Sequence, residues 1–290
     1  VTITNCIVSS NASAIKFGTD SGGGFQNVVI NNCVIYDTRN SGIALEIVDG
    51  GVMDRVTVSN IVMDNVKGAA IFLRLGNRGR PYKSEDPAVG AMRNITISNV
   101  QATRVGDWIE DVGKRVVGCS ITGLPGHPVE EVTLENVRIQ FKGGGTAKDA
   151  AREIGQRADA YPSCRMFGTL PAYGFYVRHA TDIAFRDVRL DFENDDLRPA
   201  LVLDDVLDCE IDRLVARALP ATVPGLVQLI QSRNVSIHDC RAKGTARVLL
   251  RVDGERSAGI ALADNILTNI AQQLDVGKDV PRQAVRSRSE

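Results

Sequence analysis

The sequence predicts an all-β fold, a right-handed single-stranded parallel β-helix of about nine rungs. A short phrase, apolar–any–apolar–any–Asn or Asp–apolar, recurs nine times between Val1 and Asn265, with deviations only in the seventh and last copies. Its polar corner repeats every 25 to 28 residues where no insertion intervenes. One such repeat cannot bury its apolar face alone, so the repeats are expected to stack and pair with the repeats before and after.

Each phrase alternates apolar and polar residues, which is typical of a strand and not of a helix. Asn suits the corner after the strand because its side chain tolerates unusual backbone angles and bonds neighbouring backbone groups. Stacked corners are expected to form an amide ladder. The corners are Asn5, Asn32, Asn60, Asn99, Asn136, Asp187, Arg213, Asp239 and Asp264. A second apolar strand is expected after the phrase at 14–17, 42–45, 70–73, 174–177, 200–203 and 226–229.

These elements define one domain over residues 1–274, followed by a polar, disordered tail at 275–290. The chain starts inside a strand phrase, so we expect the helix to lack its first turns here. A short helical cap is expected at 268–274 and a helix-like piece at 147–158. The middle repeats carry loop insertions that together can wall a cleft; they lie at 75–93, 103–117, 123–130 and 141–172.

The net charge, the lengths of apolar runs and the cysteine spacing exclude several classes of function. The formal net charge of −1 predicts no field for polyanions and no nucleic-acid partner. No apolar run is long enough to cross a membrane. The six cysteines include no CxxC pair, so no metal site, cofactor or disulfide framework is expected. Cys164, in the longest insertion, is the one cysteine expected to be exposed, and the protein is expected to be a monomer.

Strand alternation places Lys16, Ala44 and Phe72 on the outer face of the second apolar strands, with Glu46 and Arg74 beside them. Glu46 and Arg74 are expected to be neighbours in adjacent rungs. Two interpretations remain open: an ordinary surface ion pair, or one wall of a binding cleft.

The strongest indication of a binding site is a group of arginines. Arg74, Arg78 and Arg80 favour a carboxylate or phosphate ligand, and Tyr82 or Trp108 can stack on a sugar ring. The alternative is that these arginines pair with Glu85 and Asp86 in the same loop.

Histidines are scarce. His127, in a Pro-Gly-His-Pro turn, is a candidate ligand contact or acid–base group, or a turn residue that bonds local backbone. His179 and His238 are expected to face solvent and to have no chemical role.

Several segments resemble glycoside hydrolase family 28, the pectin-degrading, polygalacturonase-like branch of the pectin-lyase-like β-helices, here in a divergent bacterial form. They are residues 14–28, 41–47, 74–78, 123–128 and 171–179. The resemblance implies a secreted or periplasmic glycosidase acting on an acidic plant polysaccharide, by inversion between carboxyl groups on opposite faces of the sugar. The family's Asn-x-Asp and Asp-Asp motifs have no counterpart at matching positions, so the catalytic residues are expected before Val1.

The resemblance also aligns Asn11 with a family His and Glu46 with a substrate-binding Lys. The substrate-binding candidates from pattern and resemblance together are Asn11, Lys16, Asp20, Glu46, Arg74, Arg78, Arg80, Tyr82, His127 and Tyr173. Asp20 has the equal alternative of capping a turn.

Three functions therefore remain open. The first is the C-terminal portion of a glycosidase for pectin, polygalacturonate or rhamnogalacturonan, inactive in this fragment alone. The second is a non-catalytic carbohydrate-binding β-helix or adhesin. The third is a polysaccharide lyase, which would need a calcium-binding carboxylate cluster and a basic residue.

Overall fold

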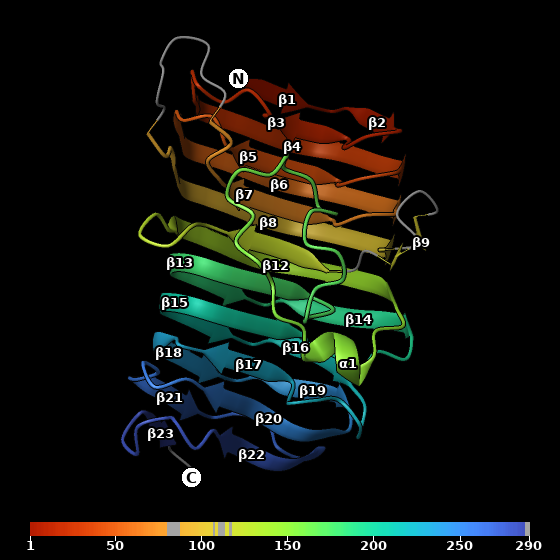
Figure 1. Ribbon diagram of the computed structural model, residues 1–290. Helices are drawn as coiled ribbons and strands as arrows, with labels where there is room; N and C mark the ends of the chain where they lie inside the picture. Colours follow the sequence, from red (N-terminus) through yellow and green to blue (C-terminus); the bar gives the residue numbers. More distant parts are fainter. Residues whose placement is uncertain (80–87, 107, 110–113, 116–117, 288–290) are drawn as a thin grey trace.

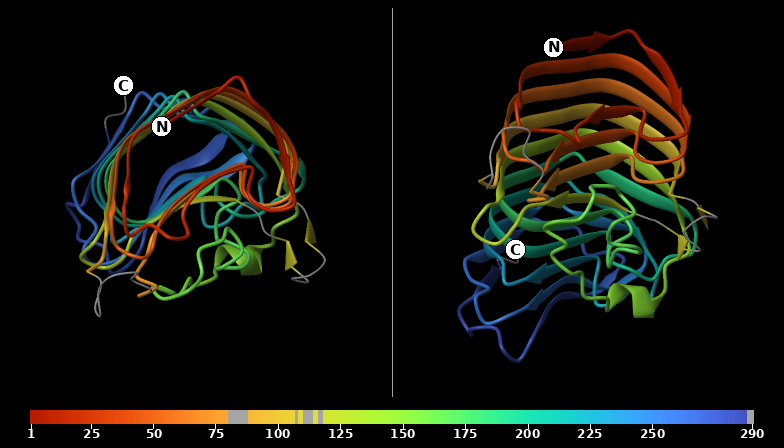
Figure 2. Two further views of the ribbon diagram at one scale, coloured as in Figure 1. Left: turned by 90° about the horizontal axis from the view of Figure 1, so that it is seen from above. Right: turned by 45° about the horizontal axis from the view of Figure 1, so that its top comes forward.

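The chain forms an all-β structure in which 21 strands belong to one curled sheet (Figure 1). This computed structural model describes residues 1–79, 88–106, 108–109, 114–115 and 118–287. Pairing between the strands of the sheet is parallel, as between β4 and β6 or β13 and β15. Seen from above, the repeats follow one another around a shared interior (Figure 2). Among the described residues, no helix is long and apolar enough to cross a membrane.

The strands fall into three columns, and the repeated phrase forms the first. Each member pairs with the member one repeat away. The first column comprises β1 (Thr2–Thr4), the opening parts of β4 (Phe25–Thr38), β6 (Val52–Val66), β8 (Ala91–Val105) and β12 (Val129–Gly143), the closing parts of β13 (Phe175–Arg186) and β15 (Leu201–Asp212), then β18 (Arg233–His238), β21 (Ile260–Ala263) and β23 (Val285–Ser287).

The second column follows the Asn corner and the third is the expected second apolar strand. The second comprises β2 (Ile7–Ser10), the closing parts of β4, β6, β8 and β12, then β14 (Arg189–Asn194), β16 (Val215–Ala218) and β19 (Arg241–Gly244). The third comprises β3 (Ile15–Phe17), β5 (Ile43–Ile47), β7 (Ile71–Leu75), β11 (Cys119–Thr122), the opening parts of β13 and β15, then β17 (Val227–Ile230), β20 (Ala246–Asp253) and β22 (Ile270–Val276). Outside the sheet lie the β9–β10 hairpin (Trp108–Ile109 and Lys114–Arg115) and helix α1 (Ala147–Ala150).

The corner residues confirm the expected role of the phrase. All nine have a left-handed backbone, with φ between 50° and 56°. Asn is among the few non-glycine residues that adopt this conformation readily. The amide ladder is also present: Asn60 donates to Asn32 at 3.1 Å, Asn99 to Asn60 at 3.1 Å and Asn136 to Asn99 at 2.8 Å. Arg213, which interrupts the pattern, instead donates two hydrogen bonds of 2.8 Å to Asp187.

The inward side chains of all three columns fill one continuous apolar core. Ile30, Val58 and Ile97, paired in register on adjacent first-column strands, are each fully buried. The alternation in the sequence predicts this stacking, because every second residue of a strand faces the same side.

The ends of helices and strands differ from expectation in two places. Residues 270–276 form strand β22 and not a helical cap, and β23 pairs with β21, so no disordered tail begins at residue 275. The expected helix at 147–158 is only the four residues of α1. Strand β22 is determined by its pairing with β20, which the local sequence does not reveal, whereas α1 starts at a local capping box of Thr146 and Asp149 and ends after one turn.

The longest insertion, residues 141–172, lies against the outer face of the third column (Figure 2). Ala44 and Phe72 point away from the main core as expected, but both are fully buried under Ile154 and Phe167 of this insertion. The expectation that Cys164 is exposed is wrong for the same reason, since its thiol is buried in this second cluster.

Candidate functional site

The candidate site lies on the early strands of the third column, where Tyr161 of the insertion covers Lys16 and Glu46. Lys16 Nζ lies 3.0 Å from Glu46 Oε2 and donates a 3.3 Å hydrogen bond to the Tyr161 hydroxyl. The same ammonium lies 4.9 Å from the centre of the Tyr161 ring. Tyr161 remains 60% exposed, so part of the side chain faces solvent while the ring contacts the cation.

Glu46 is a buried carboxyl group. Only 1% of its surface is exposed. Burial raises the pKa of Glu46 from 4.5 to about 7, against the opposing effect of Lys16 and, more weakly, of Arg78. Lys16 is the one cation within ion-pair distance of Oε2 among the described residues. The backbone at Gly18 lies close against Glu46, and only glycine fits there, since a Cβ would lie 2.9 Å from Glu46 Cβ.

Arg78 forms the other side of the site. Its Nε donates a 3.0 Å hydrogen bond to Asp49 Oδ1, and its Nη2 pairs with Asp49 Oδ2. The guanidinium carbon lies 5.9 Å from the centre of the Tyr161 ring. Asp49 holds the pKa of Arg78 above its usual value. Tyr161 therefore lies within reach of two cations, each paired with a buried carboxylate.

Arg74 does not form the expected surface contact with Glu46. The register is confirmed, because Glu46 and Arg74 are paired residues of β5 and β7. Arg74 is only 1% exposed, however, and its Nη2 donates to the carbonyls of Gln156 at 2.8 Å and Arg157 at 3.1 Å. Burial lowers its pKa to about 10. Arg74 fastens the insertion to the sheet and is not a ligand contact.

The remaining substrate-binding candidates lie in different places and do not form one site with Tyr161. Asn11 is exposed just after strand β2 of the second column. Asp20 is exposed and accepts a 3.4 Å hydrogen bond from the Gly22 amide, the turn contact expected for it. Tyr173 is fully buried and donates to the Arg217 carbonyl at 2.8 Å, so it belongs to the core. Arg80 and Tyr82 lie outside the described residues, and so do the alternative partners at 85 and 86.

The histidines also differ from one another. His127 is exposed, and its backbone exchanges two 2.9 Å hydrogen bonds with Leu124, which confirms the turn role. His179 was expected to face solvent, and that expectation is wrong. Its ring is buried between Asp205, at 2.7 Å, and Gln156, at 3.0 Å, and burial lowers its pKa. The insertion supplies Gln156 and so shields this ring.

A second carboxylate–histidine group lies on the first column, where Asp212, His238 and Asp239 can bring their ligand atoms within 4.8 Å. His238 Nδ1 lies 3.2 Å from Asp212 Oδ1. Arg213 pairs with the other oxygen of Asp212 and opposes a positive ion there. The imidazole–carboxylate contact accounts for this group.

Sequence reasoning missed Tyr161 and Asp49. Tyr161 carried a weak signal, an aromatic beside a proline in a long insertion, but its contact with Lys16 spans 145 residues. Asp49 follows a buried strand before two glycines with φ of 79° and 80°, which marks a tight turn and not a ligand site. In both cases the insertion and turn decide the geometry through tertiary contacts.

Comparison with models of known protein families finds none that matches this chain. Comparison with curated proteins also finds no match. The resemblance to family 28 therefore stays a prediction from the sequence segments.

Proposed function

We propose that the chain is a right-handed single-stranded parallel β-helix that forms part of a glycosidase for an acidic plant polysaccharide. We propose further that the surface around Tyr161 binds the acidic sugar. The parallel pairing of each column with the repeat before and after supports the fold. The resemblance to family 28 supports the substrate class, with secretion or periplasmic export as its setting.

One observation carries the binding proposal: an exposed aromatic ring with two cations near it. A sugar ring stacks on an aromatic face through its apolar C–H surface. Lys16 and Arg78 lie at 4.9 Å and 5.9 Å from the same ring. A uronic acid placed on Tyr161 would bring its carboxylate towards these two cations.

The acids of this site favour binding over bond cleavage within this chain. Inverting hydrolysis needs two carboxyl groups that face the sugar from opposite sides. Glu46 is buried beside Lys16, and Asp49 is held by Arg78. A purely carbohydrate-binding β-helix is therefore the second candidate function. A lyase is less well supported, because the one group of three potential metal ligands among the described residues, Asp212, His238 and Asp239, lies on the first column and not beside Tyr161.

The test is titration with oligogalacturonate, compared with a neutral galactan oligomer. We expect tighter binding of the acidic oligomer and a loss of at least about tenfold in affinity for Tyr161→Ala. Tyr36→Ala is the matched control, since Tyr36 is also an exposed tyrosine but lies on the second column, outside the Tyr161 site. Equal affinity of wild type and Tyr161→Ala for the acidic oligomer would overturn the binding proposal.

Cleavage separates the two candidate functions. We expect no release of reducing ends from polygalacturonate by residues 1–290, because neither buried acid is free to donate or accept a proton at a bound sugar. Measurable release that Glu46→Gln abolishes would show instead that the chemistry lies in this chain.

A further inference from the structure

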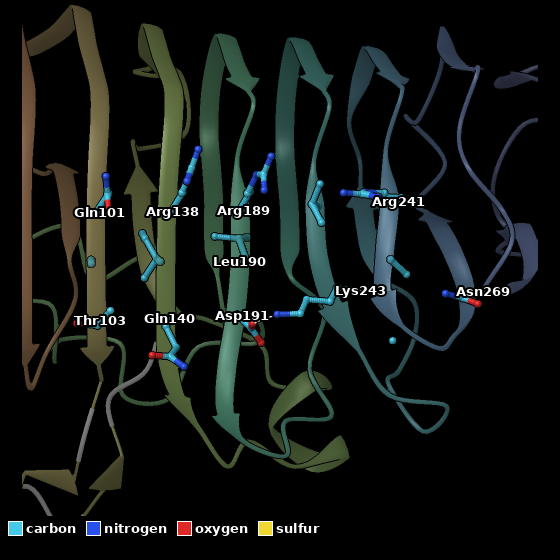
Figure 3. A pocket seen from close by; sticks show the side chains of 15 residues that line it. Gln101, Thr103, Arg138, Gln140, Arg189, Leu190, Asp191, Arg241, Lys243 and Asn269 are labelled. Atoms are coloured by element: carbon cyan, nitrogen blue, oxygen red, sulfur yellow. Dashed lines mark hydrogen bonds and ion pairs between the residues drawn. The ribbon is translucent and has the colours of Figure 1, made fainter.

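A concave surface lies on the second column (Figure 3). It is a groove of about 630 Å³ that crosses β8, β12, β14, β16 and β19. Its lining is part apolar and part basic, with Arg138, Arg189, Arg241 and Lys243 as cations and Asp191 as the single acid. We call it the arginine groove.

The three arginines occupy one row. Arg138 pairs in register with Arg189, Arg189 with Val215, and Val215 with Arg241. With about 4.8 Å between neighbouring strands, the row extends over about 14 Å along the stack. Figure 3 shows Arg138 and Arg189 on neighbouring strands, with both side chains extended in the same direction.

This row is unfavourable for folding alone. Like charges directly opposite each other on neighbouring strands destabilise a sheet. Other exposed arginines of the stack avoid this by pairing with an acid one repeat away, as Arg186 does with Glu210 and Arg213 with Asp187. None of the three groove arginines forms a side-chain hydrogen bond or ion pair with a residue that the structure describes. Arg189 interacts with Asp187 only through longer-range charge attraction, which helps to lower the pKa of Asp187.

Beside the arginine row, Asp191 is held by ion pairs with two cations. Asp191 accepts from Lys243 and, at 3.3 Å, from Arg217, whose guanidinium also lies 4.8 Å from the Phe192 ring centre. Asp191 is therefore neutralised by its own partners and does not screen the arginine row. Amide side chains of Gln101, Gln140 and Asn269 lie around it and offer neutral hydrogen bonds.

We propose that the arginine groove binds a linear anionic polysaccharide that runs along the stack, across the strands. Its carboxylate or sulfate groups would pair with Arg138, Arg189 and Arg241, and its hydroxyl groups with the neighbouring amides. Repeated anions along an extended chain match a row of cations at strand spacing. Single-stranded nucleic acid fits less well, because none of the lining residues that the structure describes is aromatic and able to stack a base.

This inference does not depend on the function proposed for Tyr161. It revises the expectation from composition that a net charge of −1 leaves no field for polyanions. The acids that balance the total lie elsewhere, many of them in ion pairs. The net charge of the whole chain therefore does not reveal this local row of positive charge.

The experiment is titration in a Tyr161→Ala background, which removes the stacking ring of the other site. The probes are polygalacturonate, dextran sulfate, unmodified dextran and an oligothymidylate, each at low and physiological ionic strength. We expect one or both anionic polysaccharides to bind, with affinity falling as salt rises. Arg138→Ala/Arg189→Ala/Arg241→Ala should weaken that binding at least about tenfold.

The matched control is Arg233→Ala/Arg247→Ala/Arg286→Ala, which removes the same charge from exposed arginines outside the groove. It should bind nearly as the background does and keep the thermal midpoint, whereas the groove variant should keep or raise the midpoint because it relieves the repulsion within the row. No binding of either anionic polysaccharide, equal loss in both triple variants, or equally tight binding of unmodified dextran would overturn the proposal. Tighter binding of the oligothymidylate would assign the groove to nucleic acid instead. Failure of the Tyr161 proposal would leave these results unchanged, because the background already lacks that ring.

Discussion

Glu46 is where burial and charge oppose each other most directly. A carboxyl group that loses its hydration favours the protonated form unless a partner compensates. Lys16 compensates in part, at 3.0 Å, and the pKa still rises to about 7. The folded protein therefore holds a proton near neutral pH that the unfolded chain releases.

This sets a pH dependence of stability. Between pH 4.5 and about 7 the unfolded state loses the Glu46 proton while the folded state keeps it. The free energy of unfolding therefore falls as pH rises through this window, by about 3 kcal/mol in total, and the Glu46 contribution is constant on either side. Glu46→Gln should remove this fall, as measured by urea unfolding midpoints across the window.

Glu210→Gln is the control of opposite sign. Arg186 lowers the pKa of Glu210, so its contribution is present above its unfolded pKa and is lost as pH falls. An unchanged pH profile in Glu46→Gln would show that Glu46 is ionised in the folded protein at pH 5.

At the level of secondary-structure elements, the corners decide where strands end. Asn60 has φ of 54° and belongs to the amide ladder on both sides, from Asn99 and to Asn32. Asn60→Ala should lower stability by about 1–3 kcal/mol, from left-handed backbone strain and lost hydrogen bonds.

Asn60→Gly separates these causes. Glycine keeps the backbone conformation and removes only the ladder, so its effect on the urea midpoint should be smaller. Equal destabilisation by Ala and Gly would refute the backbone explanation.

The insertion over the third column depends on Arg74. Its guanidinium binds two carbonyls of the insertion and lies 5.4 Å from the Phe167 ring centre. Arg74→Ala should accelerate hydrogen exchange at residues 150–168, because the buried carbonyls lose their donor. Arg213→Ala, in an exposed ion pair, should not. Unchanged exchange in Arg74→Ala would mean that Phe72 and Ile154 hold the insertion without it.

The sequence predicts the strands, the corners and the inward rows, because each follows from alternation within a few residues. It predicts the pairing of Glu46 with Arg74 in register, since the corners act as a ruler along the stack. It does not predict that both are buried, because the cover comes from residues more than 80 positions away. Tyr161 escapes notice for the same reason. Strand β22 is missed because its partner, β20, determines it.

For the whole molecule, stacking separates two outer surfaces that the same repeats build. The third column carries the Tyr161 site on its early strands, and the second column carries the arginine groove on its middle and late strands. Repeat architectures commonly use such extended faces for binding, because each added strand lengthens the surface without disturbing the core. The ligand proposed for both surfaces is an anionic sugar, bound through different residues.

The most direct test of the account is a crystal structure of residues 1–290 with an oligogalacturonate. The account predicts a sugar ring stacked on Tyr161, with its carboxylate at hydrogen-bond distance from Lys16 or Arg78. A sugar bound elsewhere with Tyr161 still bare, or a stacked neutral sugar with both cations uninvolved, would contradict it.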